Sequence, residues 1–247
     1  MSWKHEARHL LRGLGFEIYR VAKEVSDQGL SYETVLPKAA YAPWRDDPAF
    51  LECYKKIERN TLVDIYRCWE LWELIAQVSK LELGDVLEVG VWRGGTGALM
   101  AHSMELRGLK SQIYLCDTFT GVVKTGTADK YQDGAHSDTS AEHVEGLLAE
   151  LGCSNGRLLK GIFPEATGQE IEDRKFRLCH IDVDVYQSAR DVLHWVWPRL
   201  VRGGAVVFDD YGMHTTPGVT KLVNEEACAP DRMFLQNLNG HGILIKF

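Results

Sequence analysis

Hydrophobic residues change their spacing at about residue 80, and the change divides the chain into two kinds of region. Before that point, apolar residues recur every three or four positions, which is typical of amphipathic helices. The spacing predicts a helix over residues 4–25 and helical structure from about 47 to 80, with a break near residues 60–61. We therefore expect residues 1–80 to form a helical N-terminal extension and residues 81–247 to form the main domain.

The main domain alternates short apolar runs with helical stretches, which predicts a mostly parallel sheet covered by helices on both faces. Strands are expected at residues 85–90, 112–117, 156–160, 177–182, 205–209, 232–238 and 242–247. Helices are expected at residues 96–107, 140–151, 164–170 and 188–200. Because the last two strands flank the turn sequence Asn239-Gly240-His241, they should close a seven-stranded sheet as an antiparallel hairpin.

Composition narrows the class of protein without identifying it. The 247 residues carry a formal net charge of -7, which does not suggest a nucleic-acid-binding protein, because such proteins usually present a basic face. The six cysteines are scattered, so neither a zinc site nor a disulfide framework is expected. The N-terminus lacks the apolar stretch of a signal peptide, and no apolar run approaches the roughly 18 residues of a membrane span. We expect a soluble, cytoplasmic protein.

The first expected strand of the main domain leads into a glycine-rich turn that begins at Glu88 and contains glycines 90, 94, 95 and 97. Glycines allow a tight turn and a close approach of a ligand to the backbone. The spacing is neither the dinucleotide motif G-x-G-x-x-G nor a P-loop. Glu88 could bind an ammonium group, which a pyrophosphate ligand lacks, so the turn favours S-adenosylmethionine over NAD. Asp117, at the end of the second strand, is expected to accept ribose hydroxyls, although it could instead cap the turn.

Two pairs of aspartates end strands of the expected sheet, Asp182 with Asp184 and Asp209 with Asp210. Because a short right-handed crossover usually joins adjacent parallel strands, the two pairs should meet at one edge of the sheet. Crowded carboxylates repel one another unless a cation offsets their charge, and an oxygen-rich shell suits Mg²⁺. Such an ion would lower the pKa of a substrate hydroxyl, and a free carboxylate nearby could accept its proton. The alternative is a set of solvated carboxylates at loop ends.

Four segments of the chain together resemble the macrocin O-methyltransferase family of S-adenosylmethionine-dependent enzymes. They are residues 84–95, 117–121, 180–186 and 208–212. The resemblance covers about residues 55–247, and one departure is Thr120, where the family usually has glutamate. It implies a class I methyltransferase fold with a Rossmann-like sheet, a dependence on Mg²⁺, and homodimers or larger homo-oligomers. It implies as substrates small molecules that carry hydroxyl groups on deoxysugars or on aromatic rings.

The resemblance also assigns roles to individual residues. It implies metal ligation by Asp182, Asp209 and Asp210, with Asp184 as the general base. The residues expected at the cofactor, from the turn and the resemblance together, are Glu88, Gly90, Trp92, Arg93, Gly94, Thr96, Asp117, Thr118, Phe119, Gly161 and Asp182. The residues expected near the substrate are Tyr186, Tyr211 and His214. Residues 122–140 should form a lid over the site.

The sequence therefore predicts an O-methyltransferase that depends on S-adenosylmethionine and Mg²⁺ and acts on a sugar hydroxyl of a natural product or glycan. Methylation of an aromatic hydroxyl is an open alternative. An NAD-linked oxidoreductase is disfavoured, because the chain lacks G-x-G-x-x-G and has an acid at position 88. A metal-binding or scaffold protein without catalytic activity is a further class that the residues leave open.

Overall fold

The computed structural model describes residues 23–25, 29–36, 39–81, 83–127 and 129–247. The chain divides into two compact units, Met1–Leu36 and Pro37–Phe247. In the first unit, strands β1 (Lys23–Val25) and β2 (Ser31–Glu33) pair antiparallel. The helix predicted over residues 4–25 is therefore wrong at its last three residues, whose backbone pairs with β2 rather than within a helix. The rest of that predicted helix lies outside the described residues.

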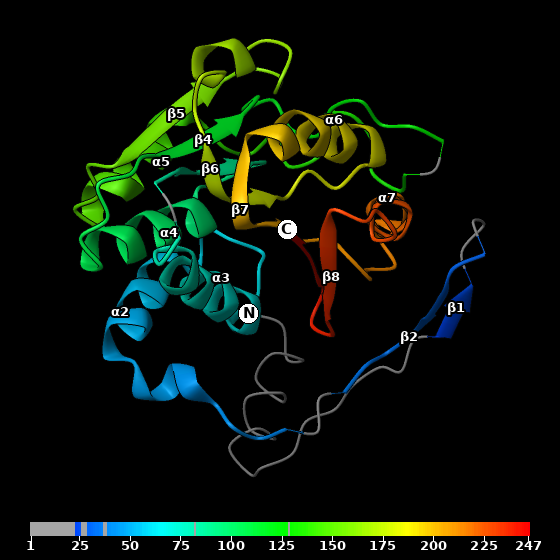
Figure 1. Cartoon of the computed structure of the whole chain (residues 1–247), viewed down its shortest axis with the longest axis horizontal. Coiled ribbons are helices and arrows are strands. Elements are labelled where there is room, and N and C mark those ends of the chain that lie inside the picture. Colours follow the sequence, from blue (N-terminus) through cyan, green and yellow to red (C-terminus); the bar gives the residue numbers. More distant parts are fainter. Residues whose placement is uncertain (1–22, 26–28, 37–38, 82, 128) are drawn as a thin grey trace. The chain divides into compact units, whose positions relative to one another are not determined.

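The second unit contains the seven-stranded sheet that the sequence predicts, with its antiparallel closing hairpin (Figure 1). Its strands are β3 (Asp85–Val89), β4 (Ile113–Asp117), β5 (Gly156–Lys160), β6 (Phe176–Ile181), β7 (Leu200–Phe208), β8 (Arg232–Asn237) and β9 (His241–Lys246). Their order is β5-β4-β3-β6-β7-β9-β8; β3 to β7 are parallel, and β9 is antiparallel to both of its neighbours. Strand order reverses between β3 and β6, and ligands of open parallel sheets bind beyond the carboxyl ends of the strands at such a point.

Helices cover both faces of this sheet (Figure 1). They are η1 (Pro43–Asp46), α2 (Pro48–Ile57), α3 (Ile65–Val78), α4 (Gly95–Leu106), α5 (Ala141–Glu150), η2 (Gly168–Ile171), α6 (Tyr186–Val196), η3 (Trp197–Arg199) and α7 (Pro217–Glu226). The helix predicted at residues 164–170 is instead a series of turns followed by η2. Pro164 and Gly168 fall in this stretch, and both residue types favour turns over a regular helix. Helix α7 escaped the sequence analysis, although Pro217 at its first position is a start signal. None of the helices among the described residues is both long and apolar enough to cross a membrane.

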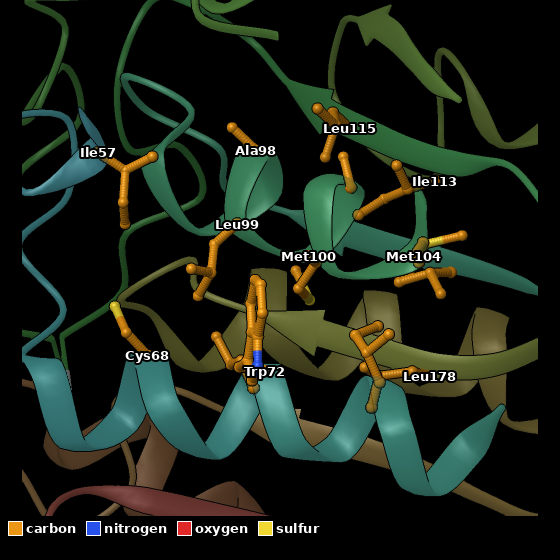
Figure 2. Close-up of a cluster of buried hydrophobic side chains, with 14 of the residues drawn as sticks. Ile57, Cys68, Trp72, Ala98, Leu99, Met100, Met104, Ile113, Leu115 and Leu178 are labelled. Atoms are coloured by element: carbon orange, nitrogen blue, oxygen red, sulfur yellow. The ribbon is translucent and has the colours of Figure 1, made fainter. Parts of the chain in front are cut away.

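Neighbouring residues of each inner strand enter different hydrophobic clusters on the two faces of the sheet. Val86 packs into a cluster with α2, α3, α4 and α5, whereas Leu87 packs into one with α6 and α7. Figure 2 shows the first cluster, where Trp72 of α3 points toward Leu99 and Met100 of α4. Trp72 is only 1% exposed, so α3 is an integral part of this core. Helix α3 is thereby held against the face of the sheet that carries the polar residues described next.

Candidate active site

A cavity of about 320 Å³ lies at the carboxyl ends of the inner parallel strands. Most of the predicted site residues line it. They are Gly90, Trp92, Thr96, Asp117, Thr118, Gly161, Asp182, Asp184, Asp209 and Asp210. The fold therefore brings the glycine turn, the end of β4 and both aspartate pairs to one place, although up to 120 residues of sequence separate them.

The glycine turn passes directly over the end of β6. Gly90 has a φ of +86°, and a side chain there would overlap the backbone carbonyl of Asp182. The backbone N–H of Asp182 in turn donates to the carbonyl oxygen of Val89 at 2.9 Å. Gly90 is thus required both by its left-handed conformation and by the close approach of two backbones. The turn and the first aspartate pair are held together as one unit.

Asp117 is bound to the backbone of the same turn. Its Oδ2 accepts hydrogen bonds from the N–H groups of Val91 at 2.7 Å and Trp92 at 2.9 Å, and its Oδ1 accepts one from Phe119 at 2.6 Å. Asp117 therefore caps the turn, which was the alternative to ribose binding. A carboxylate has about four lone-pair positions, so one remains for a ligand hydroxyl in the cavity.

Asp182, Asp209 and Asp210 form a cluster whose carboxylate oxygens lie within 4.8 Å of one another. Burial, together with the charges of the neighbouring carboxylates, raises the pKa of Asp182 and of Asp210 well above the usual range. These two pKa shifts express the cost of gathering like charges in a buried place. Three converging oxygen donors with excess negative charge are the donor set of a hard divalent cation, so the residues fit the predicted metal.

Asp184 lies beside this cluster rather than in it. Its backbone has a φ of +64°, a strained conformation for a residue with a side chain. Burial raises the pKa of Asp184 to about 6, while the charge of His136 opposes that shift. Asp184 lines the cavity and can exchange a proton near neutral pH, which suits a general base.

A polar row crosses the sheet below the cavity, on the face covered by α3 and α4. Glu88 pairs with His180 in the register of β3 and β6, and its Oε1 lies 2.9 Å from His180 Nδ1. His180 Nε2 lies 3.7 Å from Asp209 Oδ1, and His241 Nε2 lies 3.0 Å from the same oxygen. Burial alone would lower the pKa of His180, but contact with Asp209 and Glu88 raises it to about 10. The row is a chain of alternating carboxylates and imidazoles.

Glu88 is wholly buried and does not line the cavity. Its carboxylate lies against Gly97 of α4, where a β-carbon would overlap it. The alternation of side chains along β3 explains this position, because Val86, two residues earlier, also faces the α4 cluster. The structure therefore places Glu88 with His180, in the interior and off the cavity wall.

Arg67 of α3 completes the surroundings of Asp209. Its Nη1 donates to Asp209 Oδ2 at 2.5 Å and to the Asp209 carbonyl oxygen at 3.1 Å, and its Nε donates to Asp64 Oδ2 at 2.8 Å. Burial alone would raise the pKa of Asp209, but the two histidines and Arg67 lower it by more. The pKa of Asp209 therefore lies below the usual range. The pKa of Asp209 is thus lowered while those of Asp182 and Asp210 are raised, although all three residues belong to the cluster.

Part of the segment predicted as a lid lines the cavity, and its described residues are held at several points. Asp138 accepts from Trp92 Nε1 at 2.9 Å and from Arg93 Nη2 at 2.5 Å. Between such points, Tyr131 and His136 line the cavity, with ring centroids 5.3 Å apart. Burial and the charges of Asp184, Asp210 and Asp182 raise the pKa of Tyr131, which places its phenol near the aspartates.

Several predicted residues lie off the cavity wall. Besides Glu88, they are Arg93, Gly94, Phe119, Tyr186, Tyr211 and His214. Arg93 binds the lid through Asp138, while Tyr186 donates its hydroxyl to Glu225 Oε2 at 2.7 Å. The three residues expected near the substrate therefore do not contact the cavity in this structure.

The sequence analysis missed the residues that α3 and its preceding loop contribute. Residues 60–63 and Arg67 line the cavity, yet Arg67 and Asp209 are 142 residues apart in the chain. No local pattern connects such distant positions. The available signal was Asp64, which caps α3 by accepting from the N–H groups of Tyr66 and Arg67 and so fixes where the helix begins.

The chain is similar to known proteins in sequence and in fold. The family model described as macrocin-O-methyltransferase (TylF) matches residues 58–226. The chain is 29% identical over 141 residues to a tetracenomycin 4'-O-methyltransferase of Streptomyces olivaceus, covering 53% of this chain and 54% of the relative. It is 30% identical over 145 residues to mycinamicin III 3''-O-methyltransferase of Micromonospora griseorubida, covering 52% of this chain and 55% of the relative. These matches span about half the length of either relative.

Longer but weaker similarities extend over most of the chain. Demethyldecarbamoylnovobiocin O-methyltransferase of Streptomyces niveus is 25% identical over 230 residues, which covers 79% of this chain and 86% of the relative. The solved structure of the O-methyltransferase NovP superimposes with a TM-score of 0.66 at 22% identity, over 76% of this chain and 82% of that chain. The calicheamicin methyltransferase CalS11 gives a TM-score of 0.60 at 17% identity, over 84% and 94%. The structural matches establish the methyltransferase-like fold.

Proposed function

The chain belongs to the macrocin O-methyltransferase (TylF) family, and from this membership we propose that it is an S-adenosylmethionine-dependent O-methyltransferase acting on a sugar hydroxyl of a glycosylated natural product. The observation that carries the proposal is the position of the acidic cluster. Asp182, Asp209 and Asp210 line the same cavity as the glycine turn, and Asp184 stands beside them.

The glycine turn, Asp117 and Gly161 would hold S-adenosylmethionine, which when bound supplies an activated methyl group. Gly90 admits the cofactor close to the backbone, and Asp117 keeps the turn in shape while offering a lone pair to a hydroxyl. Trp92 lines the cavity, and its Nε1 donates a hydrogen bond to Asp138 that fastens it to the predicted lid segment.

Asp182, Asp209 and Asp210 would hold a divalent cation, which when bound lowers the pKa of a coordinated hydroxyl. Asp184 would accept the proton of the acceptor hydroxyl as the hydroxyl oxygen takes the methyl group, whose bond to the sulfonium sulfur breaks to leave the neutral thioether S-adenosylhomocysteine. The raised pKa of Asp184, about 6, makes its carboxylate a stronger base than an exposed aspartate while leaving it ionised at neutral pH. The backbone N–H of Asp184 donates to Asp210 Oδ2, which joins position 184 to the cluster.

The proposed substrate class follows from the relatives. One acts on a rhamnosyl tetracenomycin, another on mycinamicin III, and a third on demethyldecarbamoylnovobiocin. Loop residues 60–63 and the lid residues Tyr131 and His136 line the acceptor side of the cavity and would contact the sugar. A cytoplasmic location belongs to the same proposal, since all six cysteines are free thiols, as in a reducing compartment. A homo-oligomeric state stays a prediction.

Transfer of a deuterated methyl group from labelled S-adenosylmethionine, followed by mass spectrometry, tests the proposal. The acceptors are a rhamnosylated polyketide and a catechol, each with Mg²⁺ or with EDTA. We expect Mg²⁺-dependent labelling of the rhamnoside. Labelling of the catechol alone would assign the activity to aromatic hydroxyls. Methyl transfer that EDTA leaves unchanged would refute the proposed metal dependence. Binding of NADH without binding of S-adenosylhomocysteine would refute the proposed methyltransferase activity.

A further inference from the structure

Arg67 is the single arginine or lysine among the described residues that line the cavity, whereas five aspartates line it. Its side chain is 8% exposed, and its guanidinium lies 2.5 Å from Asp209 Oδ2. Burial alone would lower the pKa of Arg67, but the charges of Asp209 and Asp64 raise it above the usual range. A fixed positive charge is therefore built into the edge of the acidic cluster.

Asp64, the other partner of Arg67, does not cancel this charge at the cluster. The Asp64 side chain is 40% exposed, so water screens it. It also accepts the first N–H groups of α3, whose partial positive charge offsets the carboxylate. Asp209, by contrast, is 6% exposed on its side chain, so its interaction with Arg67 is much less screened.

The two histidines beside Asp209 do not alter the balance either. His180 Nδ1 lies 2.9 Å from Glu88, and His241 Nδ1 lies 2.5 Å from Glu70. Each imidazole thus has a carboxylate partner of its own besides Asp209. Arg67 remains the group that changes the net charge of the cluster.

We infer that Arg67 lowers the net negative charge of the metal site by one and so favours a divalent over a trivalent ion. The carboxylates of the cluster attract a cation, and the guanidinium of Arg67 opposes that attraction with one positive charge. Arg67 is a positioning residue that acts through Asp209, and this inference rests on the metal site of the proposed function.

The consequence is a selectivity between ions of different charge. Tb³⁺ and Ca²⁺ are similar in size and both prefer oxygen ligands, so their relative affinity reports the charge of the site. Removing one positive charge a few ångströms from the ion favours the trivalent ion by at least about tenfold relative to the divalent one. A merely structural role of Arg67 would change both affinities by the same factor.

The experiment measures Tb³⁺ luminescence, sensitised through Tyr131 or Trp92 on the cavity wall, and its displacement by Ca²⁺. In Arg67→Met and Arg67→Gln we expect the ratio of Ca²⁺ to Tb³⁺ dissociation constants to rise about tenfold or more. Arg67→Lys should stay within about threefold of the wild type, because it keeps the charge. Arg157→Met is the matched control, since Arg157 pairs with Glu170 on the surface of β5 and should leave the ratio unchanged.

A double variant covers the case in which the single neutral variants do not fold. Arg67→Met with Asp209→Asn removes one positive and one negative buried charge, so the net charge of the site is unchanged and the ratio should remain near that of the wild type despite the altered ligand. An equal change of the Ca²⁺ and Tb³⁺ affinities in the single variants, or a shifted ratio in the double variant, would overturn the inference. Either result would leave the proposed metal site standing. Failure of the wild type to bind either ion would overturn both the inference and the proposed metal site.

Discussion

The backbone N–H of Asp184 donates to Oδ2 of Asp210 at 3.3 Å, which ties the candidate base to a candidate metal ligand. The left-handed backbone of Asp184 turns the chain so that this bond forms. This hydrogen bond comes from the backbone of position 184, so it does not depend on the side chain there. The carboxylate of Asp184 can therefore be altered without moving the cluster.

Asp184→Asn should lower kcat by roughly 10²–10⁴-fold, because an amide cannot accept the hydroxyl proton. The backbone bond to Asp210 survives this substitution, and asparagine tolerates a positive φ. The dissociation constants of Mg²⁺ and S-adenosylhomocysteine, measured by calorimetry, should stay within about threefold of the wild type. A near-normal kcat would show that another group takes the proton.

Asp209 and Asp210 should respond in opposite ways when each is replaced. Asp209→Asn leaves Arg67 without its buried partner, so the free energy of unfolding without metal should fall by about 3–5 kcal/mol. Asp210→Asn relieves repulsion from the neighbouring carboxylates and should raise that free energy. Both variants should weaken Mg²⁺ binding by about tenfold or more. Urea unfolding in EDTA checks the stabilities, and equal changes of the same sign would refute the distinction.

The metal-free protein should become more stable as the pH falls from about 7 to about 5. The folded-state pKa values of Asp182, Asp184 and Asp210 are raised, that of Asp184 to about 6, so their ionised forms destabilise the fold. Protonation on the way down to the unfolded value of about 4 removes that cost. Asp209 has a lowered pKa and contributes a loss only at more acidic pH.

Saturating Mg²⁺ should abolish this gain, because the cation stabilises the ionised carboxylates at neutral pH and is released as they protonate. Thermal unfolding in EDTA and in Mg²⁺, at matched ionic strength, gives the comparison. A stability that declines steadily from pH 7 to pH 5 in EDTA would contradict the assignment of raised pKa values to these aspartates.

Much of the site could be predicted from the sequence because it lies at strand ends. Asp182 and Asp209 directly follow apolar strands, and parallel strands bring their carboxyl ends to one edge. The face of the sheet to which the Glu88 side chain points is harder to predict, because the sequence does not show which residues of β3 point to which face. The pairing of Glu88 with His180 requires knowing that β3 and β6 are neighbours in register.

Arg67 lay beyond prediction for a different reason. Its helix is amphipathic, and the sequence shows which face is apolar but not which part of the sheet that face covers. The packing of Trp72 against α4 decides this position and thereby delivers Arg67 to Asp209. Tertiary packing of this kind leaves no local mark in the sequence.

Glu88→Ala should destabilise the protein by about 1–3 kcal/mol without weakening the binding of S-adenosylhomocysteine. The carboxylate is wholly buried and bonded to His180, and it does not line the cavity. Chemical unfolding and a calorimetric titration, with Glu88→Gln as the conservative comparison, separate the two effects. If the folded Glu88→Gln variant loses cofactor affinity by more than about tenfold, Glu88 contacts the cofactor after all.

The central claim is that Asp182, Asp209 and Asp210 hold a divalent cation beside Asp184 and the cofactor turn. A crystal structure with Mn²⁺ and S-adenosylhomocysteine, with anomalous diffraction to locate the manganese, tests it most directly. The account predicts one anomalous peak about 2.1–2.3 Å from a carboxylate oxygen of each of the three aspartates, with the carboxylate of Asp184 free of the metal. A cofactor bound in the cavity with no peak at these oxygens would contradict it.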